Sequence, residues 1–215
     1  MSGMLSINDI QNQNPAELLT GVGEWLEGTG HLSQARMYYE AAFKVDKTFS
    51  LALFRLGKLA YKMGQYAEAA KALRQAVRLT PDHAPTYYHL ALACERAGKT
   101  RSAIHWAKHV LRYNSEHDGA FLVLLRCYAA LRWWRSVLRV CTVLPQRMHD
   151  IGEVKLWQAL SYVRLGQISK AAEVWMSVPG RIRKRYREES LQIEQLLSSI
   201  QTPLKDKERQ SSQSK

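Results

Sequence analysis

Small, apolar and polar residues follow one another along this chain in a pattern that repeats every 34 residues. The clearest copy runs from Ser50 to His83 and contains two apolar runs, separated by Gly64 and closed by Pro81. Apolar residues three and four positions apart place one stripe on each of two helices, and glycine and proline mark helix ends. The pattern therefore predicts a helix–turn–helix unit.

The same register holds before and after this copy without an insertion. The units span residues 16–49, 50–83, 84–117, 118–151 and 152–185. A small residue at the eighth place, such as Gly57, lets the two helices of a unit approach closely. A glycine follows the first helix in four units, where a left-handed backbone favours this residue: Gly30, Gly64, Gly98 and Gly166. The repetition predicts an all-α fold in which each unit packs on its neighbours.

The residues of the clearest copy resemble the tetratricopeptide repeat (TPR), whose pattern is W-x2-L-G-x2-Y, then A-x3-F, then P. The matching positions are Leu53, Leu56, Gly57, Ala60, Gly64, Tyr66, Ala69, Leu73, Ala76 and Pro81. Leu53 stands in place of the Trp, Ala60 of the Tyr and Leu73 of the Phe. The resemblance covers residues 16–185 and implies a right-handed α-solenoid of five helix–turn–helix units.

The ends of the chain and the fourth unit depart from this pattern. Residues 1–15 are polar and are expected to form an N-terminal leader, while Arg132 replaces the turn glycine of the fourth unit. Pro145 and Pro179 predict that the second helices of the last two units are short and that loops follow them, the later one over residues 180–184. An amphipathic pattern over residues 186–201 predicts a capping helix, and residues 202–215 predict a disordered polar tail.

The TPR resemblance implies a concave groove, lined by the first helices of successive units, that holds a peptide or a partner's helix. The positions that it carries into this groove include aromatic and aliphatic residues interleaved with cations. They are Phe54, Arg55, Lys58, Tyr61, Lys62, Tyr88, His89, Leu92, Arg96, Leu122, Arg126, Leu156, Trp157 and Arg164. Aromatic residues and arginine are common at the energetic centres of interfaces. We expect a partner segment with apolar residues and acidic flanks.

Charge is distributed unevenly along the chain, whose formal net charge is +12. Residues 1–49 hold 3 basic and 6 acidic residues, net −3, whereas residues 50–185 hold 23 and 8, net +15. The densest basic patch is Arg181, Arg183, Lys184, Arg185 and Arg187. It could contact phosphates of a nucleic acid, dock on an anionic membrane surface, or pair with Glu188 and Glu189. The opposite charges of the two ends would also permit head-to-tail self-association.

These features predict a non-catalytic scaffold or adaptor that binds another protein. TPR proteins that grip the acidic C-terminus of a heat-shock protein carry Lys and Asn on their first helices, and neither frame of this chain supplies that set. A resemblance to small bacterial TPR proteins suggests a secretion chaperone, or a scaffold in secretion, pilus or envelope assembly. The alternative from charge is a cationic scaffold for nucleic acid or an anionic membrane surface.

Enzyme chemistry and cofactors are not predicted. His105 and His109 are four residues apart on one helix, but no Glu accompanies them in a metal-binding motif, and a solvent-facing pair is the expectation. Three cysteines, Cys94, Cys127 and Cys141, form no close pair, which favours buried thiols and a reducing compartment. Because the N-terminus shows no signal-peptide pattern, we expect a cytoplasmic protein.

Overall fold

The computed structural model describes residues 14–198 of the 215-residue chain, and its helices follow the apolar pattern of the sequence. The first six are α2 (Pro15–Gly28), α3 (Leu32–Val45), α4 (Ser50–Lys62), α5 (Tyr66–Leu79), α6 (Ala84–Arg96) and α7 (Thr100–Tyr113). They are followed by α8 (Asp118–Ala130), α9 (Trp134–Val143), the 3-10 helix η1 (Gln146–Met148), α10 (Gly152–Arg164), α11 (Ile168–Met176) and α12 (Gly180–Arg185). Residues 187–198 are also helical. No strand occurs between residues 14 and 198, so this part of the chain is all-α.

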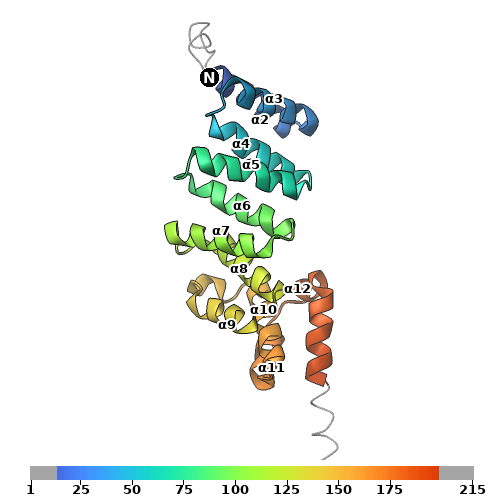
Figure 1. Ribbon diagram of the computed structural model, residues 1–215. Helices are drawn as coiled ribbons and strands as arrows, with labels where there is room; N and C mark the ends of the chain where they lie inside the picture. Colours follow the sequence, from blue (N-terminus) through green and yellow to red (C-terminus); the bar gives the residue numbers. More distant parts are fainter. Residues whose placement is uncertain (1–13, 199–215) are drawn as a thin grey trace, which may run out of the picture. The chain divides into compact units, whose positions relative to one another are not determined.

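The chain divides into two compact bodies between residues 113 and 114. We call residues 14–113 the N-terminal body and residues 114–198 the C-terminal body. In the N-terminal body the helices form three successive pairs, α2 with α3, α4 with α5 and α6 with α7, which stack in chain order (Figure 1). The expected leader over residues 1–13, the last residues of the expected capping helix and the expected polar tail lie outside the described residues.

Close helix packing in the N-terminal body depends on the small residue at the eighth place of a unit, as the sequence predicts. A Cβ atom on Gly57 would overlap the side chain of Leu73, and one on Gly23 would lie 2.5 Å from the ring of Tyr39. Consecutive pairs share apolar clusters, since Leu59 of α4 packs with Tyr39 and Leu26 of the preceding pair. The core therefore runs continuously from one pair to the next.

The turns between paired helices have the predicted left-handed backbone. The φ angles are 87° at Gly30, 78° at Gly64, 72° at Gly98 and 74° at Gly166. Arg132 takes the same conformation with φ at 58°, although it is not a glycine. The fourth unit therefore keeps the shape of the turn and bears the strain of a side chain at this place.

The last two units have short second helices, as their prolines predict. The helix α9 has 10 residues and α11 has 9, against 14 in α3, α5 and α7. The predicted loop over residues 180–184 is wrong, because these residues form α12. Pro179 precedes this helix with φ at −62°, and its carbonyl accepts hydrogen bonds from the N–H groups of Ile182 and Arg183. Proline thus ends α11 and also helps to start the next helix.

Candidate protein-interaction surface

The helices α2, α4 and α6 of the N-terminal body form one surface, which we call the first-helix surface. Ion pairs join its first two helices. The guanidinium of Arg55 lies 2.7 Å from Glu24 Oε1, and the amine of Lys62 lies 3.5 Å from Glu27 Oε1. The acidic residues of α2 therefore partner two of the cations that the TPR resemblance places in the groove.

An aromatic cluster joins α4 to α6 on the same surface. The ring of Phe54 meets His89 edge-on at 5.4 Å and His83 at 5.0 Å between centroids. The amine of Lys58 lies 5.5 Å from the centroid of Phe54, within the range of a cation–π contact. Burial lowers the pKa of His89 to about 4, and the charges of Lys58 and His83 add to this effect. Since His89 is neutral at neutral pH, Lys58 carries the positive charge of this cluster.

The other predicted groove residues of α4 and α6 surround this cluster. Tyr88 and Leu92 are half-buried and Arg96 is exposed. Tyr61 is half-buried and packs edge-on against Tyr66 at the start of α5, with 5.3 Å between centroids. The N-terminal body thus carries half-buried aromatic and aliphatic side chains beside accessible cations, which is the composition of a binding surface.

In the C-terminal body the predicted groove residues are largely occupied by contacts within the chain. Leu156 is fully buried and Trp157 is buried, so the expectation that these two face a partner does not fit their packing. The ring of Trp157 meets Tyr186 edge-on at 5.4 Å. Burial raises the pKa of Tyr186 to about 12, and Glu153 adds to this effect. Glu153 also accepts a hydrogen bond from Arg126 at 3.1 Å.

The C-terminal helical segment, residues 187–198, explains why this face of α10 is closed. Arg164 of α10 donates a hydrogen bond to Gln192 of this segment, and its guanidinium lies 6.0 Å from the centroid of Trp134. Ile193 of the segment is fully buried. Leu122 of α8 is half-buried. The chain itself therefore contacts two of the α10 residues, Trp157 and Arg164, that the sequence assigned to a partner.

The predicted basic patch lies on α12 and the residue that begins the C-terminal helical segment. Four of its cations, Arg181, Lys184, Arg185 and Arg187, are exposed. Arg183 is half-buried and has a structural role, because it donates hydrogen bonds to the carbonyls of Val178 and Trp175 at 3.0 and 2.8 Å. Its guanidinium also stacks 4.3 Å from the centroid of Trp175. The patch thus offers four cations to a partner.

Comparisons with known proteins agree with this arrangement of paired helices. Residues 50–83 match the family model of the tetratricopeptide repeat. The structure of YrrB, described as a TPR protein with an unusual peptide-binding site, covers 90% of this chain and 95% of its own at a TM-score of 0.70 and 15% identity. The structure of the MamA protein covers 80% and 94% at a TM-score of 0.69 and 18% identity. The protein has a tetratricopeptide-repeat fold.

Two further similarities of this TPR fold are partial. Over 126 residues the sequence is 32% identical to the protein O-mannosyl-transferase Tmtc3 of Drosophila melanogaster; this covers 52% of the chain but only 14% of the transferase. The first TPR of Spaghetti (RPAP3), solved with the HSP90 peptide SRMEEVD, covers 55% of this chain and 94% of its own at a TM-score of 0.53 and 19% identity. At these identities the solved structures show the fold.

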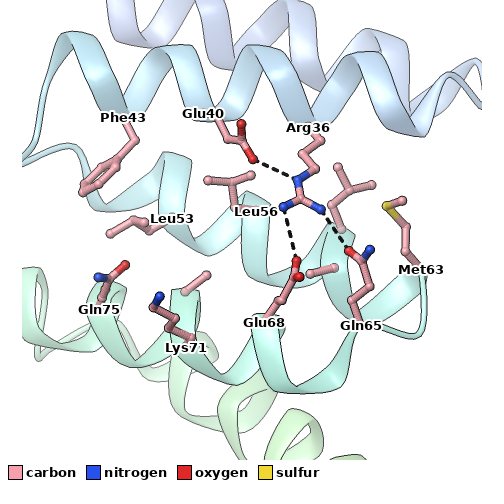
Figure 2. A pocket seen from close by; sticks show the side chains of 13 residues that line it. Arg36, Glu40, Phe43, Leu53, Leu56, Met63, Gln65, Glu68, Lys71 and Gln75 are labelled. Carbon is pink, nitrogen blue, oxygen red and sulfur yellow. Dashed lines mark hydrogen bonds and ion pairs between the residues drawn. The ribbon is translucent and has the colours of Figure 1, made fainter.

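A pocket on the other side of the N-terminal TPR pairs was not predicted from the sequence. Its volume is about 400 Å³, and it lies between α3 and α5 with an apolar floor that includes Leu53 and Leu56 of α4 (Figure 2). Arg36 bridges its rim, with hydrogen bonds or ion pairs of 2.8 Å to Glu40, 3.2 Å to Glu68 and 3.2 Å to Gln65. The four-residue spacing of Arg36 and Glu40 could have indicated their pairing, but the contacts with α5 depend on the fold.

Other candidate chemistry finds no site in the described TPR chain. The imidazole of His109 stacks on Tyr87 at 4.0 Å between centroids, so this histidine belongs to an aromatic cluster rather than to a solvent-facing pair. Among residues 14–198, no group of three or more His, Cys, Asp or Glu side chains could hold a metal ion. The three cysteines are free and buried. None of the helices between residues 14 and 198 has the length and apolar character needed to cross a bilayer.

Proposed function

We propose that this chain is a non-catalytic scaffold or adaptor that binds a peptide or helix of another protein on the first-helix surface of its N-terminal body. TPR arrays generally present surfaces for other proteins rather than catalytic sites. The observation that carries the proposal is the Phe54–His89 cluster with Lys58 beside it. Two similar folds are solved as a TPR protein with a peptide-binding site and as a TPR bound to a peptide, which supports a peptide ligand.

The charges on this surface refine the expected partner. Arg55 and Lys62 already pair with Glu24 and Glu27, so an acidic ligand would have to displace these carboxylates to use them. Lys58 contacts an aromatic ring and makes no ion pair with a described carboxylate. We therefore expect the acidic flank of the ligand to lie at Lys58, and its apolar residues to lie over Leu92 and Tyr88.

Selection from a random dodecapeptide display library on the immobilised full chain tests this function. The enriched peptides should combine apolar residues with Asp or Glu. Lys58→Glu and Leu92→Asp should each weaken binding of these peptides tenfold or more, which corresponds to about 1.4 kcal/mol. The matched control is Lys108→Glu, which makes the same change of charge on the exposed face of α7. Peptides that bind Lys58→Glu and Lys108→Glu equally well would contradict the assignment of the surface.

The second candidate is an anionic partner, nucleic acid or a membrane surface, on the basic patch. It is supported by the four exposed cations of the patch and weakened by the engagement of Arg183. Phosphate contacts lose affinity steeply as salt rises. A salt titration against a random single-stranded oligonucleotide and against anionic vesicles checks it, and absence of binding at low ionic strength to both would exclude it.

A further inference from the structure

The outer face of α2 is an apolar stripe exposed at the end of the N-terminal body. The exposed fractions are 37% for Leu18, 41% for Val22 and 66% for Trp25. In Figure 1, α2 and α3 form the first pair of the stack, with α4 and α5 on one side of them. We call Leu18, Gly21, Val22, Trp25 and Gly28 the α2 stripe. At 100° per residue, these five positions lie within an arc of about 120°.

The repeat register shows that this face is built to be covered. The positions 34 residues after Leu18 and Trp25 are Ala52 and Leu59, which are 0% and 1% exposed. Leu59 is buried because Leu26, Ala35 and Tyr39 of the preceding pair pack on it.

A further 34 residues along the chain, the same positions are buried again. They are Thr86, Leu90 and Ala93, with exposed fractions of 1%, 0% and 0%. The α2 stripe therefore has the place in its unit that receives another helix in the second and third units.

The stripe carries no charge that a covering helix would have to desolvate. The three charged residues of α2 are Glu17, Glu24 and Glu27, and all of them lie outside the arc. Glu24 and Glu27 instead pair with α4 on the first-helix surface. Burying an apolar face that contains a large aromatic residue is favourable, because little polar surface has to lose water.

The pattern of large and small residues on the stripe is self-complementary. In an antiparallel pair of α2 helices with a two-fold axis near residue 23, the numbers of facing residues add up to 46. Trp25 then faces Gly21 of the other copy, and Leu18 faces Gly28. Neither glycine has a neighbour within 4 Å of the place where a Cβ would be, so both leave room for a large side chain. Alternation of large and small residues across a helix pair is the arrangement that packs most closely.

We infer that the α2 stripe is the interface of a two-fold symmetric dimer, in which a second copy of this chain packs its α2 helix antiparallel to the first. Such an interface is isologous, because the same patch serves both subunits. It leaves the first-helix surface of each copy free, so a dimer would present two peptide-binding surfaces. Its salt dependence separates it from the head-to-tail association suggested by the charges of the two ends. An apolar interface persists in high salt, whereas attraction between opposite charges weakens.

Sedimentation velocity on the full chain at 1–100 µM, in low salt and in 0.5 M salt, tests this inference. The expected result is a concentration-dependent dimer under both conditions. Trp25→Glu should weaken dimerisation at least 100-fold, and Met37→Glu, which alters a residue of α3 that is 68% exposed, should leave it unchanged. Gly21→Leu should also abolish the dimer by filling the space that Trp25 of the other copy needs. This variant cannot be explained by loss of folding, because leucine favours a helix more than glycine does.

Disulfide trapping checks the antiparallel register. A mixture of Leu18→Cys and Gly28→Cys chains should cross-link between the two variants, while Leu18→Cys alone should not cross-link with itself. The three natural cysteines are buried and contribute little background. The inference fails if the full chain stays monomeric at 100 µM, as it would if another part of the chain covered the stripe. It also fails if Trp25→Glu and Gly21→Leu dimerise like the natural chain.

Discussion

Arg132 is a single residue whose backbone opposes its chemistry. It occupies the place of Gly98 in the preceding unit, and the hydrogen bonds of the two turns correspond. The N–H of Trp133 donates to Tyr128 at 2.8 Å, as that of Lys99 donates to Cys94 at 2.8 Å. A left-handed conformation costs a residue with a Cβ about 1–2 kcal/mol, while a glycine loses more freedom on folding. The balance favours glycine in this turn.

We therefore predict that Arg132→Gly raises the free energy of unfolding of the C-terminal body by about 0.5–1 kcal/mol. The matched variant Gly98→Ala should lower stability by about 1 kcal/mol. No atom lies within 4 Å of the added Cβ at residue 98, so only the backbone is strained. Urea denaturation followed by circular dichroism measures both effects. Equal stability of all three proteins would show that the turn does not distinguish these residues.

The buried imidazole of His89 links stability to pH. Burial lowers its pKa to about 4 in the folded protein, while the unfolded chain titrates near the ordinary value of 6.5. Between these values the unfolded chain binds more protons, so stability is present above pH 6.5 and is lost as the pH falls toward 4. We predict that lowering the pH from 7 to 4.5 destabilises the N-terminal body, and that His89→Gln removes about 1–2 kcal/mol of this loss. The pKa of His109 is also lowered, so some pH dependence should remain.

At the scale of the helices, the contact between α4 and α5 depends on one absent methyl group. The Cβ of an alanine at residue 57 would overlap Leu73, which is fully buried. Overfilling a packed core costs about 1–3 kcal/mol, although alanine favours a helix more than glycine does. We predict that Gly57→Ala lowers the free energy of unfolding by about that amount.

A double-mutant cycle provides the control for this prediction. Leu73→Ala alone leaves a cavity and should cost about 2–5 kcal/mol. The double variant should cost less than the sum of the two, since each change relieves the other. Simple additivity in thermal and urea denaturation would show that the two side chains do not compete for the same space.

The helices and turns could be predicted from the sequence because they depend on local pattern. A 34-residue register fixes where Gly64 and Gly98 must stand, and both have the left-handed φ that this position requires. The burial of Trp157 in the interior could not be predicted in this way. It depends on where the chain returns after Pro179, and Trp157 meets Tyr186, which is 29 positions away. The pairing of Arg55 with Glu24 is likewise an interaction between units, so the sequence showed both charges but not their neutralisation.

At the scale of the whole molecule, the chain is a repeat array divided into two compact bodies. In such arrays each unit packs on its neighbours, and stability is close to a sum of unit and interface terms. A substitution that weakens the packing inside one body should therefore raise local opening in that body first. Two matched variants can test this in the full chain. Gly57→Ala perturbs the packing of α4 on α5, and Val137→Ala removes fully buried methyl groups from α9.

We predict that hydrogen exchange monitored by mass spectrometry separates the two bodies. In Gly57→Ala, amides of α2–α7 should exchange roughly tenfold faster or more, since about 1.4 kcal/mol changes an opening equilibrium tenfold. Amides of α8–α11 should keep their natural rates. Val137→Ala should give the opposite pattern. If either variant accelerated exchange equally on both sides of residues 113 and 114, the chain would open as a single cooperative unit. A partner bound on the first-helix surface would then stabilise the C-terminal helices as much as the N-terminal ones. Independent bodies instead confine that effect to α2–α7.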